Sequence, residues 1–211
     1  MFFFKKTHHN NYIILVNIYE YVLNYTKIII IEGLDNTGKT TIINKLMSLY
    51  DNVYYIHCTK PKTNDLNEQK VFFLKKIKEI KELYNSLILS PELIILDRSW
   101  LGEYVYGSLY RKNDKQSIIN IIEECYKELQ NLNYVTILLT CDNVDFCLKH
   151  SDKKSLSNDK KEYIINEINL FHEISSYNFI NKPNIFELKV NDGLEFKDKD
   201  EIFNNVLSLI K

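Results

Sequence analysis

Several residue types are scarce in this chain of 211 residues, and each scarcity excludes a class of protein. There are only four cysteines, too few for a disulfide-built secreted scaffold, so Cys58, Cys125, Cys141 and Cys147 are expected to be reduced, buried thiols. The formal net charge of -1 provides no basic excess for coating nucleic acid or an anionic membrane. No apolar run approaches the ~18 residues of a membrane-spanning helix, and polar residues interrupt the apolar N-terminus. We therefore expect a soluble, cytoplasmic protein without nucleic-acid or membrane partners.

Arginine is the scarcest charged residue. Lysine and arginine together number 27, yet only Arg98 and Arg111 are arginines. Glycine (5) and proline (3) are also rare, which indicates a strongly biased composition. Because lysine supplies positive charge almost everywhere else, we expect the two arginines where a planar, bidentate, permanently charged group is required.

The distribution of apolar residues predicts one α/β domain. Five short runs rich in Ile, Val and Tyr are typical of strands buried on both faces. These runs are Lys27–Glu32, Asn52–Cys58, Glu92–Asp97, Tyr134–Cys141 and Asn184–Val190. Amphipathic helical patterns separate them, so we expect a three-layer fold: a five-stranded parallel sheet with helices on both faces. Such folds bind ligands at the carboxyl ends of their strands, just after residues 32, 58, 97, 141 and 190.

Two segments stand apart from this alternation. Residues 1–26 precede the first strand and are expected to form an N-terminal extension, either a short helix packed outside or a poorly ordered stretch. Residues 27–211 then form the domain. Within it, residues 150–160 are polar and lie between two helical patterns, where we expect a mobile lid; an ordinary solvated loop is the alternative.

A phosphate-binding motif follows the first strand. Residues 33–40 read GLDNTGKT, which matches the P-loop pattern G-x-x-x-x-G-K-[ST] between a strand and a helix. Backbone N–H groups and a helix N-terminus converge there on phosphate oxygens. We expect ATP as the ligand, Lys39 at its β- and γ-phosphates, and the Thr40 hydroxyl on Mg²⁺. The remaining phosphate contacts are expected from Gly33, Asn36, Thr37, Gly38 and Thr41.

A P-loop alone does not identify the reaction. The string GLDNTGKTT resembles the opening of ADP-ribosylation-factor-type small GTPases, but the sequence has neither their D-x-x-G nor their N-K-x-D motif. With Glu32 included, IEGLDNTGKTT resembles the start of thymidylate kinases instead. A second motif supports this resemblance: Asp97-Arg98-Ser99 closes the third strand. At that place thymidylate kinases carry a D-R-aromatic motif and deoxynucleoside kinases an E-R-S motif. Residues 97–111 look most like virus- and phage-type thymidylate-kinase-like proteins.

The resemblance implies roles for three residues. Asp97 would hold Mg²⁺ through water, and Arg98 would grip the transferring and acceptor phosphates. Asp35 would approach the sugar hydroxyl of the acceptor, or else stabilise its own loop. A homodimer is also implied by the resemblance.

The residues after the second strand bear on the acceptor. A nucleoside 5′-hydroxyl needs a general base, whereas a 5′-phosphate needs cationic clamps. This stretch carries Lys60 and Lys62 and no carboxylate before Asp65, which favours a monophosphate. The alternative for each lysine is a place on the solvated surface. His57 offers a base, although we expect it to be a buried strand-end residue.

Further acceptor contacts are expected from Phe73, Tyr106 and Arg111. Phe73 would stack on the base or simply pack in the core, and Tyr106 would line the nucleoside pocket. Arg111 would touch phosphate or serve as a cation at a helix C-terminus.

Together these features predict ATP-dependent phosphorylation of a deoxynucleoside monophosphate, dTMP to dTDP. Two alternatives stay open: a deoxynucleoside kinase and a non-catalytic nucleotide-binding switch. The lid contains no arginine, and Lys149, Lys153 and Lys154 are its nearby cations, which weakens the expectation of fast phosphoryl transfer.

Overall fold

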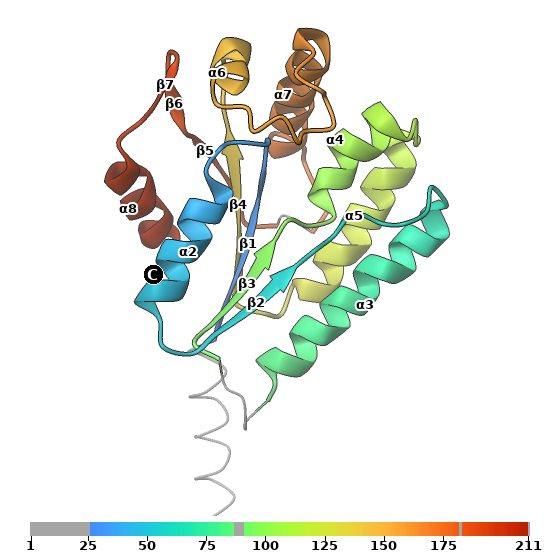
Figure 1. The fold of residues 1–211 in the computed structure, drawn as a ribbon. Coiled ribbons are helices and arrows are strands. Elements are labelled where there is room, and N and C mark those ends of the chain that lie inside the picture. Colours follow the sequence, from blue (N-terminus) through green and yellow to red (C-terminus); the bar gives the residue numbers. More distant parts are fainter. Residues whose placement is uncertain (1–25, 87–90, 182, 211) are drawn as a thin grey trace, which may run out of the picture.

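The computed structural model describes residues 26–86, 91–181 and 183–210, which form a sheet wrapped by helices (Figure 1). The expected extension at 1–26 lies outside these residues except for Thr26, which is buried and donates a hydrogen bond to the Pro91 carbonyl at 2.7 Å. The sheet contains β1 (Lys27–Gly33), β2 (Val53–His57), β3 (Leu93–Asp97), β4 (Tyr134–Thr140) and β5 (Ile185–Lys189). Its strands are all parallel, in the order β2-β3-β1-β4-β5. The predicted parallel sheet is confirmed, and each strand ends within one residue of its predicted bounds.

Helices cover both faces of the sheet, which confirms the three-layer fold. On one face lie α2 (Lys39–Leu49) and α8 (Lys199–Ile210); on the other lie α3 (Leu66–Tyr84), α4 (Leu101–Tyr110), α5 (Lys115–Leu129) and α7 (Lys161–Ser175). The short α6 (Val144–Lys149) stands beyond the carboxyl end of β4 and packs on α7. The side chain of Asp65 accepts a hydrogen bond from the Glu68 backbone N–H at 2.9 Å, which is how the sequence begins α3.

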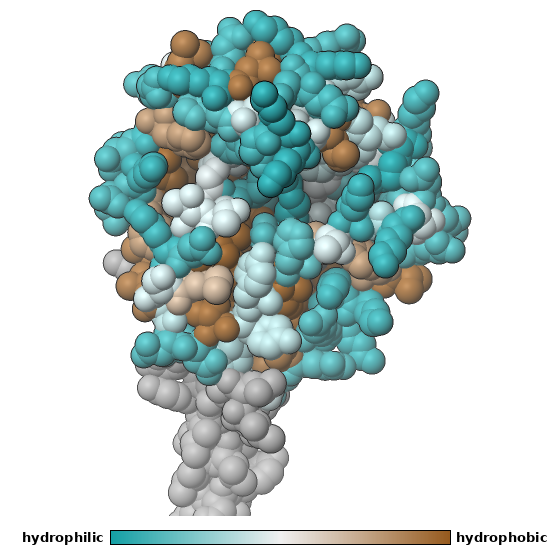
Figure 2. All heavy atoms as spheres, in the orientation of Figure 1, coloured by the Kyte–Doolittle hydropathy of each residue, from teal (hydrophilic) through white to brown (hydrophobic). Residues whose placement is uncertain are grey.

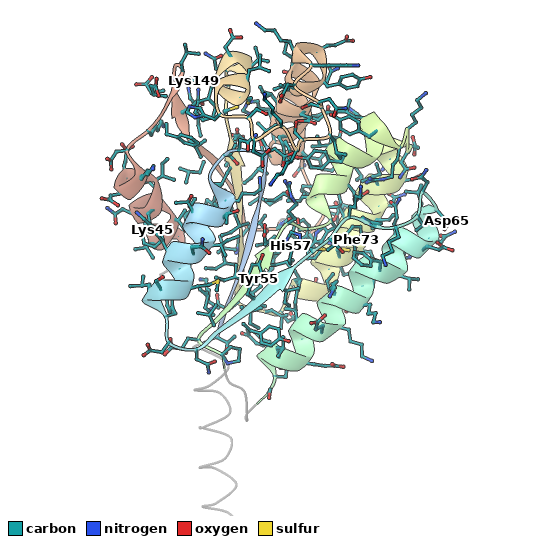
Figure 3. The ribbon with its side chains drawn as sticks, viewed as in Figure 1. Lys45, Tyr55, His57, Asp65, Phe73 and Lys149 are labelled. Carbon is teal, nitrogen blue, oxygen red and sulfur yellow. The ribbon has the colours of Figure 1, made fainter. Side chains whose placement is uncertain are left out.

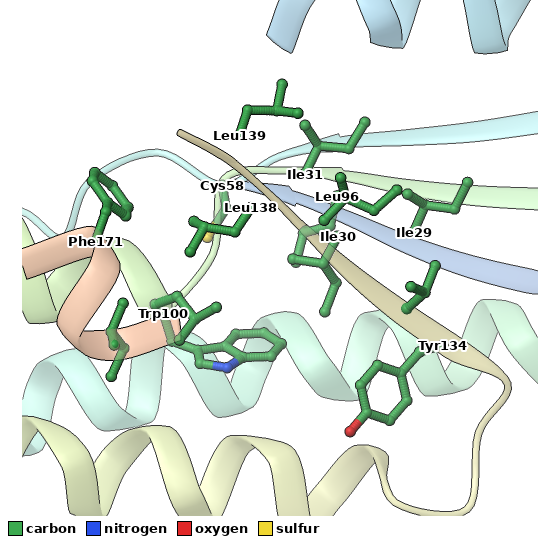
Figure 4. Close-up of a cluster of buried hydrophobic side chains, with 14 of the residues drawn as sticks. Ile29, Ile30, Ile31, Cys58, Leu96, Trp100, Tyr134, Leu138, Leu139 and Phe171 are labelled. Carbon is green, nitrogen blue, oxygen red and sulfur yellow. The ribbon is translucent and has the colours of Figure 1, made fainter. Parts of the chain in front are cut away.

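The core forms where the central strands meet these helices (Figure 4). Ile28–Ile31 of β1 are fully buried, as are most residues of β3 and β4. Trp100, just before α4, is fully buried and meets Tyr126 edge-to-face, with ring centroids 5.6 Å apart. Because Trp100 comes two residues after Arg98, the same packing that fills the core fixes the segment that leads into the site.

The expectation that all five strands are buried on both faces is wrong for the two edge strands. Tyr54 and Tyr55 of β2 and Phe186 of β5 are each about two-fifths exposed. Edge strands have a neighbour on only one side, so the helical layers cover them incompletely. The sequence analysis also missed a small antiparallel hairpin, β6 (Asn191–Asp192) and β7 (Glu195–Phe196), which follows β5.

The carboxyl ends of the strands all lie at one end of the molecule, under α6, the 150–160 segment and the β6–β7 hairpin. In Figure 2, hydrophilic side chains cover this end in the view shown. In the described part of the chain, no helix combines the length and apolar character needed to cross a membrane.

Candidate active site

The P-loop has a backbone shape that particular glycines permit. Gly33 ends β1 with φ +140°, and a Cβ there would lie 2.0 Å from the Leu139 carbonyl oxygen of β4. Gly38 precedes α2 with φ +85°, in the left-handed region that favours glycine. Asn36 also has a positive φ of 62°. The loop therefore curls tightly over the N-terminus of α2, as an anion-binding loop does.

Lys39 is the buried cation of this loop. Its Nζ donates to the Gly33 carbonyl oxygen at 3.0 Å and to the Leu34 carbonyl oxygen. Burial lowers the pKa of Lys39 to about 8, with Arg98 acting in the same direction and Asp35, Glu32 and Asp97 opposing it. The loop carbonyls thus hold the ammonium where a phosphate oxygen would compete for it.

An open cavity of about 410 Å³, here called the P-loop cavity, lies over this loop. Asn36, Gly38, Lys39 and Thr40 line its floor. Thr40 is exposed there, as a hydroxyl that binds a metal ion must be. The other walls come from Asp35, Arg98, His150, Asp152, Lys154 and Phe196.

Arg98 is held by acidic partners from β1 and the P-loop. Its Nη1 donates to Glu32 Oε1 at 3.3 Å and to the Gly33 carbonyl oxygen at 3.2 Å, and its Nη2 pairs with Asp35. Its guanidinium also lies over the Tyr106 ring, 5.5 Å from the centroid. Burial alone would lower the pKa of Arg98, but Tyr106 and the two carboxylates raise it above its usual value. The guanidinium therefore stays charged and oriented.

A second pocket, of about 270 Å³, adjoins the P-loop cavity. Asp35, Arg98 and Lys154 line both, so these three residues mark the junction. Both arginines of the chain line this second pocket. Its other walls include Glu32, Lys60, Phe73, Gly102, Glu103 and Tyr106.

Glu103 and Arg111 form a buried ion pair in this second pocket. Arg111 Nη2 donates to Glu103 Oε2, and the side chains are only 12% and 9% exposed. Burial raises the pKa of Glu103, and the Arg111 guanidinium opposes that shift. Arg111 is the C-cap residue that directly follows α4, so the helix-end position expected for it is correct.

Asp97 ends β3 beside the P-loop strand, where it pairs with Ile31 in the sheet register. Its Oδ2 accepts from the Tyr55 hydroxyl at 2.8 Å and contacts His57 Nδ1 at 3.0 Å. Tyr55 and His57, both labelled in Figure 3, are two residues apart on β2 and therefore project from the same face of the strand. Burial and this bond raise the pKa of Tyr55 to about 12. The expectation that His57 is buried is wrong: its side chain is half exposed, because β2 is an edge strand.

The remaining predicted residues divide into those near the cavities and those away from them. Phe73 is 1% exposed, so it packs in the core as one reading expected, and it also forms part of the second pocket's wall. Lys60 lines that pocket, whereas Lys62, also within the described residues, is exposed and lines neither cavity. Thr37 and Thr41 face a more apolar cavity of about 330 Å³ on the far side of Gly38.

The 150–160 segment connects α6 to α7 directly over the site. Its His150 and Asp152 line the P-loop cavity, Leu156 lines the second pocket, and Lys154 lines both. Ser151 Oγ donates to Asp159 at 2.5 Å, which closes the segment on itself. The segment occupies the place expected of a lid; its movement remains a prediction.

Sequence reasoning missed three contributors to these cavities. Glu103 lies eight residues before Arg111, a spacing that places both on one side of a helix, and this spacing was the available signal. Phe196 reaches the P-loop cavity from the unpredicted β6–β7 hairpin. His150 packs with Phe146 and Phe196 in a cluster of three rings whose centroids are 4.7 to 4.8 Å apart, and no local pattern indicates the contacts with Phe196.

Comparison with known proteins gives information on structure only. No protein-family model and no curated protein sequence matches this chain. Among solved structures, YorR protein of Bacillus subtilis, in complex with phosphorylated GDP, is similar with a TM-score of 0.60 and 17% identity, over 87% of this chain and 95% of that one. Thymidylate kinase from Candida albicans gives a TM-score of 0.54 and 20% identity, over 88% and 91%. Polyphosphate kinase 2 from Arthrobacter aurescens gives 0.60 and 10%, over 98% and 78%.

These likenesses show the fold. The chain has the three-layer α/β fold of P-loop kinases, which agrees with its parallel five-stranded sheet and with the P-loop between β1 and α2. Identities of 10–20% do not show which reaction this chain catalyses or which substrates it binds.

Proposed function

We propose that this protein transfers the γ-phosphoryl group of ATP to the 5′-phosphate of a deoxynucleoside monophosphate, converting dTMP to dTDP. The observation that carries this proposal is the junction between the two cavities. A donor site over the P-loop and a second pocket share Arg98 and Lys154, so two phosphates bound in them would meet at a pair of cations. Positioning and charge neutralisation are what phosphoryl transfer requires of a protein. The thymidylate kinases that share the fold act in the same reaction class by name.

On the donor side, the proposal assigns the P-loop N–H groups to the β-phosphate and Lys39 to the β- and γ-phosphates. Lys39 would then exchange its present carbonyl partners, Gly33 and Leu34, for phosphate oxygens. Thr40 and Asp97 would hold Mg²⁺, since a hydroxyl and a carboxylate are the hard oxygen donors that this ion prefers. When bound, Mg²⁺ neutralises part of the phosphate charge. Asp97 ends β3 beside the strand that enters the P-loop, which supports placing it near the same ion.

On the acceptor side, the carboxylates nearest the junction are already engaged. Glu32 Oε2 accepts from the Ser99 backbone N–H at 2.7 Å, and Glu32 Oε1 from Gly33 N–H at 3.0 Å as well as from Arg98. Asp35 pairs with Arg98 too. A carboxylate that is fixed by N–H donors and an arginine is a poor general base. This favours an acceptor that arrives as a phosphate anion and needs no base.

One observation favours the nucleoside-kinase alternative. His57 lines the second pocket and contacts Asp97 at 3.0 Å, and a histidine oriented by a carboxylate is a common general base. A coupled ADP-release assay on nucleosides and monophosphates separates the two reactions. We expect ADP release with deoxynucleoside monophosphates; release with nucleosides alone would instead establish the alternative.

Lys60 provides a test of the acceptor end. If Lys60 contacts the acceptor phosphate, Lys60→Ala should lower kcat/KM for dTMP by about tenfold or more through KM, since one charge-assisted contact is worth roughly 1.5–3 kcal/mol. The KM for ATP should not change. Lys62→Ala is the matched control, because Lys62 lies outside the cavities. Equal KM values for dTMP in both variants and wild type would show that neither lysine contacts the acceptor phosphate.

The lowered pKa of Lys39 predicts how ATP binding depends on pH. Only the protonated lysine donates to phosphate, so the affinity it contributes is present below its free pKa of about 8 and is lost as the pH rises above it. Between about pH 7 and about pH 9 the Kd for ATP should rise roughly tenfold, which titration calorimetry would measure. In Lys39→Met the same pH change should have little effect. A pH-independent Kd in the wild type would contradict a phosphate contact by Lys39.

A further inference from the structure

The two arginines of the chain lie at different parts of the second pocket. Arg98 also lines the P-loop cavity and therefore marks the phosphate end. Arg111 and its partner Glu103 line the second pocket but not the P-loop cavity. A monophosphate whose phosphate lies at Arg98 would extend its nucleoside away from the junction, toward the part of the pocket that holds this pair.

The pair is costly to bury, which needs an explanation. Removing a carboxylate and a guanidinium from water is offset only when geometry and further hydrogen bonds are favourable, and apolar residues of similar volume are often as stable. Here the hydrogen bonding of the buried pair is incomplete, since the buried Nε of Arg111 has no hydrogen-bond partner among the described residues. This Nε is itself covered by protein atoms, but the carboxylate and the guanidinium both line the cavity, and a charged pair in that place is suited to recognising a polar ligand there.

The helix makes room for the pair. A Cβ at Gly107 would lie 3.1 Å from Glu103 Oε2 and 3.3 Å from Ile118 Cδ1, so a larger residue there would press on the Glu103 carboxylate, while Arg111 Nη2 would lie at an ordinary contact distance of 3.5 Å. Glycine inside a helix costs about 1 kcal/mol relative to alanine, and here it leaves space for the ion pair. The pocket also has aromatic walls on two helices, Phe73 of α3 and Tyr106 of α4, as a flat ring requires.

We propose that Glu103 and Arg111 together read the hydrogen-bonding edge of the acceptor's nucleobase, the carboxylate accepting from a ring N–H and the guanidinium donating to the adjacent acceptor. For thymine these atoms are N3–H and O4. The substrate class is then a nucleotide whose base carries a ring N–H next to a carbonyl oxygen, and a sugar phosphate without a base is rejected. This inference rests on the proposed acceptor site, and it assigns Arg111 to the base, whereas the sequence alone suggested a phosphate contact or a cation at a helix C-terminus.

The test removes the pair as a unit. Glu103→Met with Arg111→Met takes away both charges at nearly constant volume, so neither is left buried and unpaired. The matched control is Lys115→Met with Glu173→Met, which removes an exposed pair between α5 and α7 outside both cavities. Melting temperatures verify folding. Calorimetric titrations then compare dTMP, N3-methyl-dTMP and 2-deoxyribose 5-phosphate.

Wild type and control should bind dTMP at least about 10²-fold more tightly than the other two ligands, because a site built for hydrogen bonding strongly rejects an analogue that leaves its buried groups unpaired. In the Glu103/Arg111 variant dTMP and N3-methyl-dTMP should bind within a few-fold of one another, whereas 2-deoxyribose 5-phosphate should still bind more weakly, because it has no ring for Phe73 and Tyr106 to contact. Full preference in the variant, or none in the wild type, would overturn the proposal. Thymidine and N3-methylthymidine, titrated in parallel, separate it from the proposed function: a base preference with nucleosides alone supports the pair's role while contradicting the monophosphate acceptor.

Discussion

Lys39→Ala should lower kcat at least about 10³-fold while the protein still folds. Lys39 is the cation assigned to the β- and γ-phosphates, where charge changes most during transfer, and such preorganised contacts contribute several kcal/mol to transition-state stabilisation. The fold should tolerate the loss, since within the described part of the chain the Nζ bonds only the P-loop carbonyls of Gly33 and Leu34. Turnover and circular dichroism should be measured on the same preparation.

Two further variants sharpen that result. Lys39→Met fills the buried space left by alanine and should be equally inactive. Lys81→Ala removes a surface lysine of α3 that pairs with Glu128, and it should retain normal turnover. A folded Lys39→Ala protein with wild-type kcat would show that the P-loop does not serve phosphoryl transfer in this chain.

Arg98→Lys should lower kcat by at least about 10²-fold, or about 2.7 kcal/mol, with little change in melting temperature. The substitution keeps the charge but removes the planar fork that reaches Glu32, Gly33 and Asp35 at once. Arg98 has φ +67°, and a lysine would adopt this backbone at the same cost. The change therefore isolates the head group.

Arg111→Lys is the natural comparison, because it removes the other arginine from the same pocket. It should weaken binding of dTMP and leave kcat at saturating dTMP much less affected. Near-wild-type kcat for Arg98→Lys would show that the planar guanidinium is not required for phosphate contacts at this position.

Local sequence patterns predicted the parts of this protein that depend on local physics. The P-loop follows from two glycines with positive φ and a strand-to-helix change, and the capped start of α3 follows from Asp65 and Glu68. Strand positions followed from continuous apolar runs. Exposure at β2 did not, because whether Tyr55 and His57 are covered depends on the strand order, which no local pattern encodes.

The same distinction applies within the candidate site. Arg98 was expected at the phosphates from its place after β3, but its carboxylate partners come from β1 and the P-loop, 66 and 63 residues earlier, and only the fold brings them together. Arg111 was singled out by composition, yet its pairing with Glu103 depends on the end of α4 and on the room beside Gly107. Phe196 reaches the P-loop cavity from a hairpin of four paired residues, too short for periodicity to reveal.

Transfer of label from [γ-³²P]ATP tests the central claim most directly. The purified protein is incubated with Mg²⁺, labelled ATP and either dTMP or thymidine, and the products are separated. Our account predicts label in the β-phosphate of dTDP with dTMP, and none in dTMP formed from thymidine. Two results would contradict it: labelled dTMP from thymidine with no labelled dTDP from dTMP, or ATP binding without transfer of label to either acceptor.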